Sequence, residues 1–215
     1  MMNNEDKISF KAAEILIDLK CINFSPKKQF KLTSGKKSPV YCDCRRLISF
    51  PKERDLLTKF SVDKIKKFKN FEKINIIAGG ESAGIPFASF ISSKLKLPMV
   101  YVRKEKKKFG KNSQIEGVFN ANDNMLLVED LMTDGGSKFK FFDAINNAKC
   151  TNLGLFVIFN YGILDEYLPF KNSKIKLTFL TNWNYVLKVA SKKEILNKKE
   201  IIIIKNFLSS IGIKN

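Results

Sequence analysis

Two adjacent carboxylates, Glu129 and Asp130, are the residues of this 215-residue chain best placed to do chemistry. They follow the apolar run Met125–Val128 and precede a glycine turn, Thr133–Ser137 (T-D-G-G-S), that leads into a helical pattern. Glycines let backbone N–H groups approach an anion closely, and a helix start favours negative charge. Carboxylates accept hydrogen bonds from hydroxyls or bind a cation. The stretch therefore offers a phosphate site beside a hydroxyl or cation site.

A second interpretation of the same stretch is purely structural: two acids cap a strand before a glycine turn. The sequence lacks both G-x-x-x-x-G-K-[ST] and G-x-G-x-x-G, so a P-loop and a dinucleotide fingerprint are excluded. A ribose 5-phosphate carries a phosphate and hydroxyls, and would use both halves of the stretch. From these residues alone both interpretations stay open.

The composition excludes several kinds of chemistry. The chain has no His, so Ser-His and Cys-His nucleophilic mechanisms are excluded. Among its four cysteines, Cys42 and Cys44 would share one face of a strand, but without His a metal site lacks ligands, and core thiols fit better. The polar N-terminus has no signal-peptide pattern, and no apolar run has the length of a membrane span. We therefore expect a cytoplasmic protein with reduced thiols and no membrane partner.

The net charge of +18 comes from 39 basic and 21 acidic residues. Only four of the basic residues are Arg, the side chain that nucleic-acid readers use for bidentate contacts. A Lys-dominated excess along the whole chain indicates solvated faces, so we do not expect a nucleic-acid partner. A small acidic substrate suits this charge.

Alternating strand and helix patterns predict an α/β fold, with one domain spanning residues 1–215. Strands separated by helices form a parallel sheet with right-handed crossovers, and open parallel sheets bind ligands beyond their C-terminal strand ends. The predicted strands are Ile74–Ala78, Met99–Val102, Met125–Val128, Leu153–Phe159 and Leu177–Leu180; the predicted helices are 5–20, 51–69, 85–95, 138–148 and much of the last 30 residues; a hairpin spans 30–42, and a long polar loop 103–117.

The full string 128–137 (V-E-D-L-M-T-D-G-G-S) resembles the phosphoribosyl-diphosphate motif of type I phosphoribosyltransferases. In that family the two acids bind the ribose 2- and 3-hydroxyls, and the T-x-G-G-S turn wraps the 5-phosphate. The resemblance implies that phosphoribosyl diphosphate is bound by Glu129, Asp130, Leu131, Met132, Thr133, Asp134, Gly135, Gly136 and Ser137.

Three further segments narrow the resemblance to orotate phosphoribosyltransferases. Residues 101–110 (Y-V-R-K-E-K-K-K-F-G) resemble their R-K-x-x-K-x-H-G loop, and residues 30–39 (F-K-L-T-S-G-K-K-S-P) resemble their F-x-L-x-S-G-x-x-S-P hairpin. Residues 79–86 (G-G-E-S-A-G-I-P) resemble the loop that contacts diphosphate. The four segments occur in the family's order.

Three positions depart from the family pattern. Thr33 stands where Lys is common, Phe109 stands where His is common, and no Arg follows Arg103. The pattern therefore leaves open which residues bind the orotate carboxylate.

The resemblance implies an enzyme that joins orotate to ribose 5-phosphate, releases diphosphate and uses Mg²⁺. It assigns catalysis to Asp130 and to the cations Arg103, Lys104 and Lys107, which also bind phosphoribosyl diphosphate. It places orotate against Thr133, Tyr41 and Cys42, and it assigns no residue directly to the metal.

The family likeness also implies an arrangement of parts. A small hood would be formed by the N-terminal hairpin region, mainly residues 1–50, plus the C-terminal segment. Loop 103–111 would serve the neighbouring subunit of a homodimer. Two alternatives stay open, namely a phosphoribosyltransferase for another base and a non-catalytic regulator of the same fold that binds nucleic acid.

Overall fold

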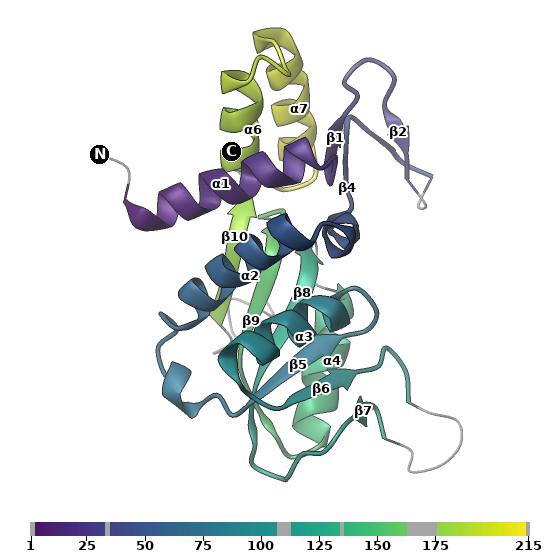
Figure 1. The fold of residues 1–215 in the computed structure, drawn as a ribbon. Coiled ribbons are helices and arrows are strands. Elements are labelled where there is room, and N and C mark those ends of the chain that lie inside the picture. Colours follow the sequence, from purple (N-terminus) through teal and green to yellow (C-terminus); the bar gives the residue numbers. More distant parts are fainter. Residues whose placement is uncertain (1–2, 33–34, 107–112, 134–135, 163–175, 214–215) are drawn as a thin grey trace.

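The computed structural model describes residues 3–32, 35–106, 113–133, 136–162 and 176–213. Its main strands are β5 Ile76–Gly80, β6 Met99–Val102, β7 Ile115–Glu116, β8 Asn124–Met132, β9 Thr151–Asn160 and β10 Lys176–Asn182. They form one six-stranded sheet in the order β10-β9-β8-β5-β6-β7 (Figure 1). Neighbouring strands are parallel except for β7, which runs antiparallel to β6. The predicted parallel α/β sheet is confirmed.

Helices cover both faces of this sheet, which explains why its central strands are apolar on both sides. The helices are α1 Asn4–Asp18, α2 Pro51–Ile65, α3 Gly84–Leu95, α4 Gly136–Asn147, α6 Trp183–Lys192 and α7 Lys198–Ser210, with short 3₁₀ helices η1 Cys44–Ser49 and η2 Phe71–Lys73. On β8, Leu126 and Val128 join the core that includes α2 and α3. Met125 and Leu127 join the core beneath α4 on the other face.

Of the predicted strands only β6 has the predicted bounds, and two of the differences bear on the site. Strand β5 covers Ile76–Gly80 rather than Ile74–Ala78, and β8 continues to Met132 rather than stopping at Val128. Strand β8 outlasts its apolar run because β9 runs beside it, with Glu129 opposite Val157 and Met132 opposite Asn160. The two acids therefore lie inside a strand.

The polar stretch 103–117 also contains structure that its composition does not indicate. Strand β7 pairs Ile115 with Val102, and the Ile115 side chain is buried against the α4 face of the core. A single apolar residue in a Lys-rich segment was too weak a signal to predict this strand.

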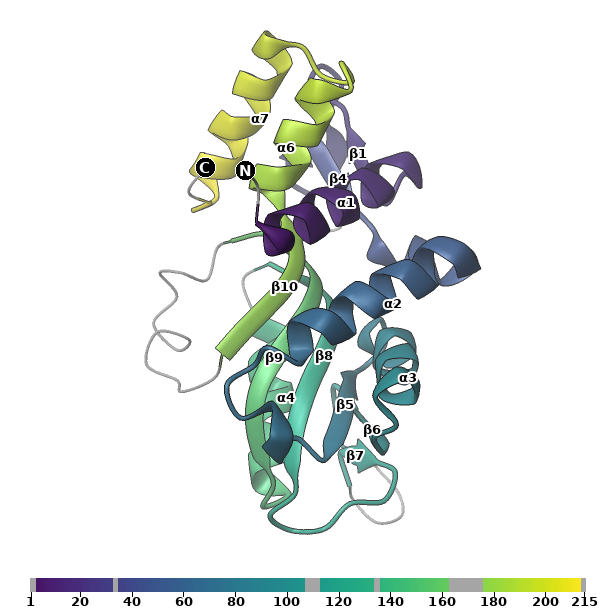
Figure 2. The same cartoon turned by 60° about the vertical axis from the view of Figure 1, so that its left-hand side comes forward.

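The N-terminal and C-terminal segments lie side by side above the C-terminal ends of the strands (Figure 2). The short strands β1 Ile22–Phe24 and β4 Val40–Cys42 pair with each other, as do β2 Phe30–Lys31 and β3 Lys37–Ser38. Helix α6 follows β10 directly and packs on α1, where the Phe10 and Tyr185 rings meet edge to face at 5.0 Å. The Tyr185 hydroxyl donates to Asp6 at 2.6 Å.

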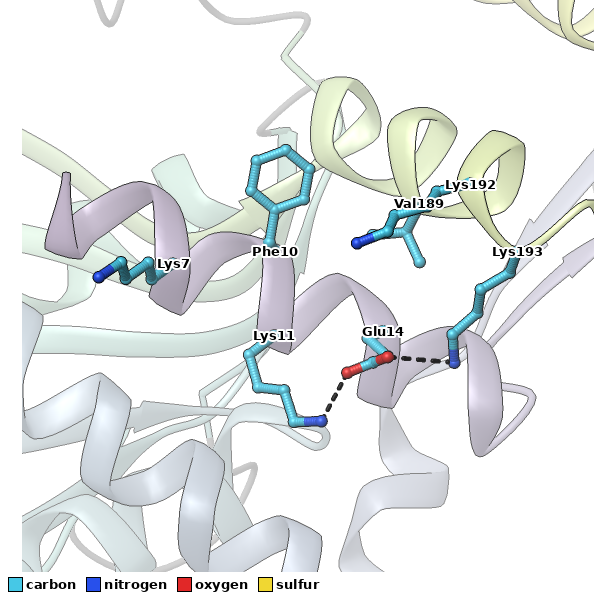
Figure 3. A pocket seen from close by; sticks show the side chains of 7 residues that line it. All are labelled: Lys7, Phe10, Lys11, Glu14, Val189, Lys192 and Lys193. Atoms are coloured by element: carbon cyan, nitrogen blue, oxygen red, sulfur yellow. Dashed lines mark hydrogen bonds and ion pairs between the residues drawn. The ribbon is translucent and has the colours of Figure 1, made fainter. Parts of the chain in front are cut away.

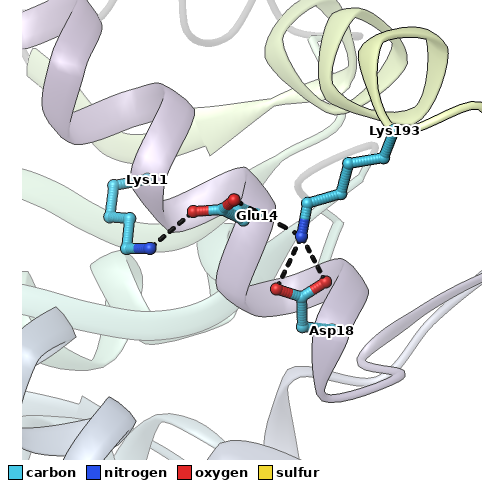
Figure 4. A network of polar contacts seen from close by, with 4 residues as sticks. All are labelled: Lys11, Glu14, Asp18 and Lys193. Carbon is cyan, nitrogen blue, oxygen red and sulfur yellow. Dashed lines mark hydrogen bonds and ion pairs between the residues drawn. The ribbon is translucent and has the colours of Figure 1, made fainter.

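Ion pairs add to the contact between α1 and α6 (Figure 4). Lys193 Nζ lies 2.6 Å from Asp18 Oδ1 and 3.3 Å from Glu14 Oε1, and Glu14 also pairs with Lys11. These side chains are partly exposed, so each pair contributes at most about 1 kcal/mol. Burial of apolar side chains between the two helices therefore stabilises their contact more than the ion pairs do.

Gly84 is required where α3 meets β8. A methyl group there would lie 2.4 Å from the Val128 carbonyl oxygen and 2.5 Å from Glu129 Oε1. A backbone carbonyl cannot move aside cheaply, so Gly84→Ala is expected to lower the free energy of unfolding by about 1–3 kcal/mol. Urea denaturation measures the change. The control Ser93→Ala, on the exposed side of the same helix, should stay within about 0.5 kcal/mol of wild type. An unchanged stability of the Gly84→Ala variant would contradict this close contact.

Candidate active site

The candidate site lies where β5 leaves the sheet while β8 continues. The last β5–β8 pair joins Gly79 to Val128, and beyond it β8 is paired only with β9. The freed edge of β8 carries Glu129 and Asp130, next to the loop that connects β5 to α3. The region outside the carboxyl ends of neighbouring parallel strands is where open α/β sheets bind ligands.

Glu129 is buried, with 4% of its surface exposed. Its Oε2 accepts a hydrogen bond from the Lys138 ammonium in the first turn of α4, which forms a buried ion pair. Its Oε1 has no hydrogen-bond partner among the described residues. Burial raises the pKa of the Glu129 carboxyl to about 7, while the charges of Lys138 and Lys104 act in the opposite direction. Glu129 thus keeps one buried oxygen as an acceptor.

Glycines make room for this carboxylate. A methyl group on Gly80 would lie 2.1 Å from Glu129 Oε1 and 2.7 Å from the Phe141 ring, and Gly84 is almost as close to the same oxygen. The glycines of the 79–86 segment therefore have a packing role toward Glu129, besides allowing a close backbone approach to an anion.

Asp130 occupies a different environment, because successive side chains of a strand point to opposite faces. It is half-buried, and burial raises the pKa of its carboxyl, which the charges of Lys138 and Arg45 oppose. The surroundings of the two acids therefore differ: Glu129 forms an ion pair with Lys138 of α4, while Asp130 experiences the charge of Lys138 and, more weakly, that of Arg45 on η1.

The predicted phosphate turn connects β8 to α4. Thr133 is exposed, and α4 begins at Gly136, so the helix start lies where the turn requires it. Met132 is fully buried and its carbonyl oxygen accepts from the Tyr161 backbone N–H at 2.8 Å, while Leu131 is half-buried. Asp134 and Gly135 lie outside the described residues, and Ser137 is described only as part of α4.

Arg103 and Lys104 follow the end of β6. The Arg103 backbone N–H donates to Gln114 O at 2.8 Å, and Gln114 Nε2 donates back to Arg103 O at 2.9 Å. Glu81 Oε2 accepts from the Lys104 backbone N–H at 2.8 Å. The 79–86 loop and the R-K segment, far apart in sequence, are therefore joined. Lys107 lies outside the described residues.

The hairpin side of the site ends in η1, which packs against β8. Tyr41 is 40% exposed and Cys42 is half-buried, at the end of β4. Burial raises the pKa of Tyr161, at the end of β9, and the neighbouring Cys42 and Cys44 thiols raise it further. The structure therefore brings the predicted orotate residues Tyr41 and Cys42 to the ends of β8 and β9.

Several residues of this site were missed by the sequence reasoning. Lys138 had a detectable signal, because it occupies the apolar face that Phe141, Phe142 and Ile145 define on α4 at helical spacing. A lysine on such a face needs a buried acidic partner. The roles of Glu81, Gln114, Arg45 and Tyr161 come from contacts between distant segments, for which one sequence contains no signal.

The comparisons with known proteins point in one direction. The chain is 42% identical over 199 residues to the orotate phosphoribosyltransferase of Rhizobium rhizogenes. The alignment covers 92% of this chain and 86% of that protein. Residues 51–184 match the family described as the phosphoribosyl transferase domain. The chain belongs to the orotate phosphoribosyltransferase family. The resemblance of the four sequence segments is thereby confirmed at the level of the family.

Solved structures of this fold agree. The chain aligns with UMP synthase of Leishmania donovani at a TM-score of 0.78 and 24% identity, over 94% of this chain and 42% of that one. It aligns with orotate phosphoribosyltransferase of Aeropyrum pernix at a TM-score of 0.71 and 22% identity, over 86% and 99% of the two chains. At these identities the likeness concerns the fold.

A cavity of about 500 Å³ lies elsewhere, between α1 and α6 (Figure 3). Four lysines, Glu14, Phe10 and Val189 line it, and none of the site residues described above does. Across the described ranges, every helix is too short or too polar to cross a membrane.

The pKa of Glu129 makes stability depend on pH. Its value is about 7 in the folded protein against an ordinary 4.5, so the folded state holds this proton more tightly. The resulting stability is fully present below pH 4.5 and lost as the pH rises through about 7. Between pH 5 and pH 8, wild type should lose about 2.5 kcal/mol of unfolding free energy relative to Glu129→Gln.

Urea denaturation at the two pH values measures this difference. Glu5→Gln, which removes an exposed carboxylate paired with Lys67, is the matched control and should follow the wild-type pH profile. A constant gap between wild type and Glu129→Gln from pH 5 to pH 8 would show that Glu129 has an ordinary pKa.

Proposed function

We propose that this protein is an orotate phosphoribosyltransferase. It transfers ribose 5-phosphate from 5-phosphoribosyl 1-diphosphate to N1 of orotate, which gives orotidine 5'-phosphate and diphosphate for pyrimidine synthesis. The observation that carries the proposal is the 42% identity to a protein of that name over 92% of the chain. The acids, the phosphate turn and the R-K segment around one strand-end site support it.

Phosphoribosyl diphosphate fits this site in one orientation. Its 5-phosphate meets the N-terminus of α4 and the turn 133–137, where backbone N–H groups and the helix dipole favour an anion. Its ribose hydroxyls donate to the Asp130 carboxylate. The resemblance assigns Glu129 to the ribose as well, through a carboxylate whose Oε1 is buried against Gly80 and Gly84. Its diphosphate extends toward the loop after β5 and toward Arg103 and Lys104.

The chemical step separates C1 of the ribose from a diphosphate that gains negative charge. Fixed cations aimed at that charge are the main means of lowering the barrier. Lys104 is close enough to favour the ionised form of Glu129, and Glu81 holds its backbone. Lys107, from the same motif, is assigned to this task by the resemblance. A His base is not needed when orotate binds as its N1 anion, with Thr133, Tyr41 and Cys42 around the base.

Mg²⁺ suits the donor set of this site. The half-buried Asp130 carboxylate is the kind of hard oxygen ligand that Mg²⁺ prefers, and substrate phosphates usually supply the remainder. When bound, Mg²⁺ would neutralise charge on the diphosphate. No cluster of three or more His, Cys, Asp or Glu suited to a metal occurs among the described residues.

We also propose a cytoplasmic homodimer in which loop 103–111 carries Lys107 to the active site of the neighbouring subunit, while Gln114 and Glu81 hold the backbone of Arg103 and Lys104, at the start of the loop, in their own subunit. The resemblance of residues 101–110 to the family's catalytic loop supports this arrangement. A two-fold interface would exchange the two loops reciprocally.

A base panel tests the activity. The purified protein is assayed with Mg²⁺ and phosphoribosyl diphosphate while diphosphate release is measured. Orotate should exceed uracil, adenine, guanine and hypoxanthine by at least about 100-fold in kcat/KM, about 2.7 kcal/mol of discrimination. Comparable turnover of uracil or a purine would indicate a phosphoribosyltransferase for another base. Absence of turnover with every base would favour the non-catalytic regulator.

Subunit mixing tests the shared site. Lys107→Ala and Asp130→Asn should each nearly abolish activity, because each removes a charged contact to phosphoribosyl diphosphate, worth about 2–3 kcal/mol in the case of Asp130. After dissociation and re-association, about half of the dimers are mixed, and each has one intact site of two. Activity should rise to about one quarter of wild type. With subunit exchange proven by tagged chains, a mixture as inactive as the single variants would show that the loop serves its own subunit.

A further inference from the structure

Arg45 is a charged residue near the site. The proposed reaction, as described above, does not use it. It is the second residue of η1, directly after the hairpin strand that carries Tyr41 and Cys42. Its charge opposes the rise in the Asp130 pKa, and the Tyr41 side chain is a second group in electrostatic contact with it. The guanidinium is therefore within electrostatic range of both Tyr41 on the hairpin and the Asp130 carboxylate.

One edge of this guanidinium is held and the other is available. Arg45 Nε donates to Asp43 Oδ1 at 2.6 Å, and the same carboxylate accepts from the Arg45 backbone N–H at 3.2 Å. This is the only hydrogen bonding of its side chain within the described residues, and 59% of the side chain is exposed. Asp43 thus orients Arg45, while its two terminal nitrogens remain a planar pair of donors that matches a carboxylate.

The other three arginines are engaged elsewhere. Arg46 donates from Nε to Leu19 O, and Arg54 donates to Ile48 O and stacks on Phe90. Arg103 pairs with Glu116 at the end of β6. Of the four arginines, Arg45 is the one whose charge acts on the Asp130 carboxyl.

The two other anionic groups of the substrates already have positions. The 5-phosphate lies at the α4 N-terminus, and the diphosphate lies beside the ends of β5 and β6. Arg45 belongs to η1, which packs against β8, and the hairpin strand before it meets Tyr161 at the end of β9. What remains on that side is the base, attached to C1 of the ribose that Asp130 holds.

We propose that Arg45, oriented by Asp43, binds the carboxylate of orotate and sets the preference for orotate over bases that lack a carboxylate. The inference rests on the proposed function and deepens it. Related enzymes often bind the base with an arginine later in the chain, but here no Arg follows Arg103. The inference assigns recognition of the orotate carboxylate to Arg45 of η1 instead. Arg45 would thus contact the substrate although it lies outside the four segments that resemble the family.

The test compares orotate with uracil, which differ by the carboxylate. Arg45→Met should lower kcat/KM for orotate by about 100-fold and leave kcat/KM for uracil within about threefold, because only orotate loses a charge-assisted contact. Arg45→Lys keeps the charge but loses the planar pair of donors, and should lower kcat/KM for orotate by about tenfold. The KM for phosphoribosyl diphosphate should stay within about twofold of wild type in both.

Arg46→Met is the matched control, since it removes a neighbouring guanidinium of η1 that points to Leu19, and it should keep the wild-type preference for orotate. Calorimetric binding of orotidine 5'-phosphate and UMP reads the same preference without turnover. Arg45→Met should lose the preference for orotidine 5'-phosphate. Arg45→Gln replaces Arg45→Met in both experiments if the latter does not fold.

Two results would overturn the inference. An Arg45→Met protein with the wild-type ratio of orotate to uracil would show that the carboxylate is bound elsewhere. An equal loss with both bases and a raised KM for phosphoribosyl diphosphate would place Arg45 on the ribose or the diphosphate. A wild-type protein without preference for orotate would instead refute the proposed function, which is a separate outcome.

Discussion

The buried ion pair between Glu129 and Lys138 is the constraint around which the site is built. An ionised carboxylate at 4% exposure is costly unless a cation lies beside it, so α4 has to bring Lys138 to the end of β8. The pair spans the turn from strand to helix, and thereby sets where the α4 N-terminus sits relative to the acids. Gly80 and Gly84 follow from the same constraint, because any larger residue would occupy the space of the carboxylate.

The geometry of strand β8 gives the two acids different surroundings. Since neighbouring side chains of β8 point to opposite faces, Asp130 lies on the face opposite Glu129, within the electrostatic range of Arg45 on η1, which packs against β8. In the proposed reaction, phosphate recognition would belong to the sheet and α4, and base recognition to the segment above the strand ends. That segment is made of the first and last parts of the chain, joined where α1 packs on α6. The packing of the two termini therefore controls where the hairpin meets β8.

Much of the fold followed from local patterns, because apolar runs and helical spacings report directly on burial. The strand order of the sheet and the extension of β8 to Met132 did not, since both depend on which strand runs alongside. Strand β7 was missed for a similar reason: Ile115 becomes part of the core only when β6 is beside it. Pairing partners are a property of the folded chain.

The candidate site shows the same division. The sequence by itself determined the acids, the phosphate turn and the R-K segment, because each is a contiguous string whose chemistry is local. Only the tertiary structure decided that Glu129 is buried against Lys138 while Asp130 lies within the electrostatic range of Arg45, that Glu81 holds Lys104, and that Tyr161 meets the hairpin. These relations join residues on different elements, and their electrostatic energies depend on distance and burial, which are defined only after the chain has folded.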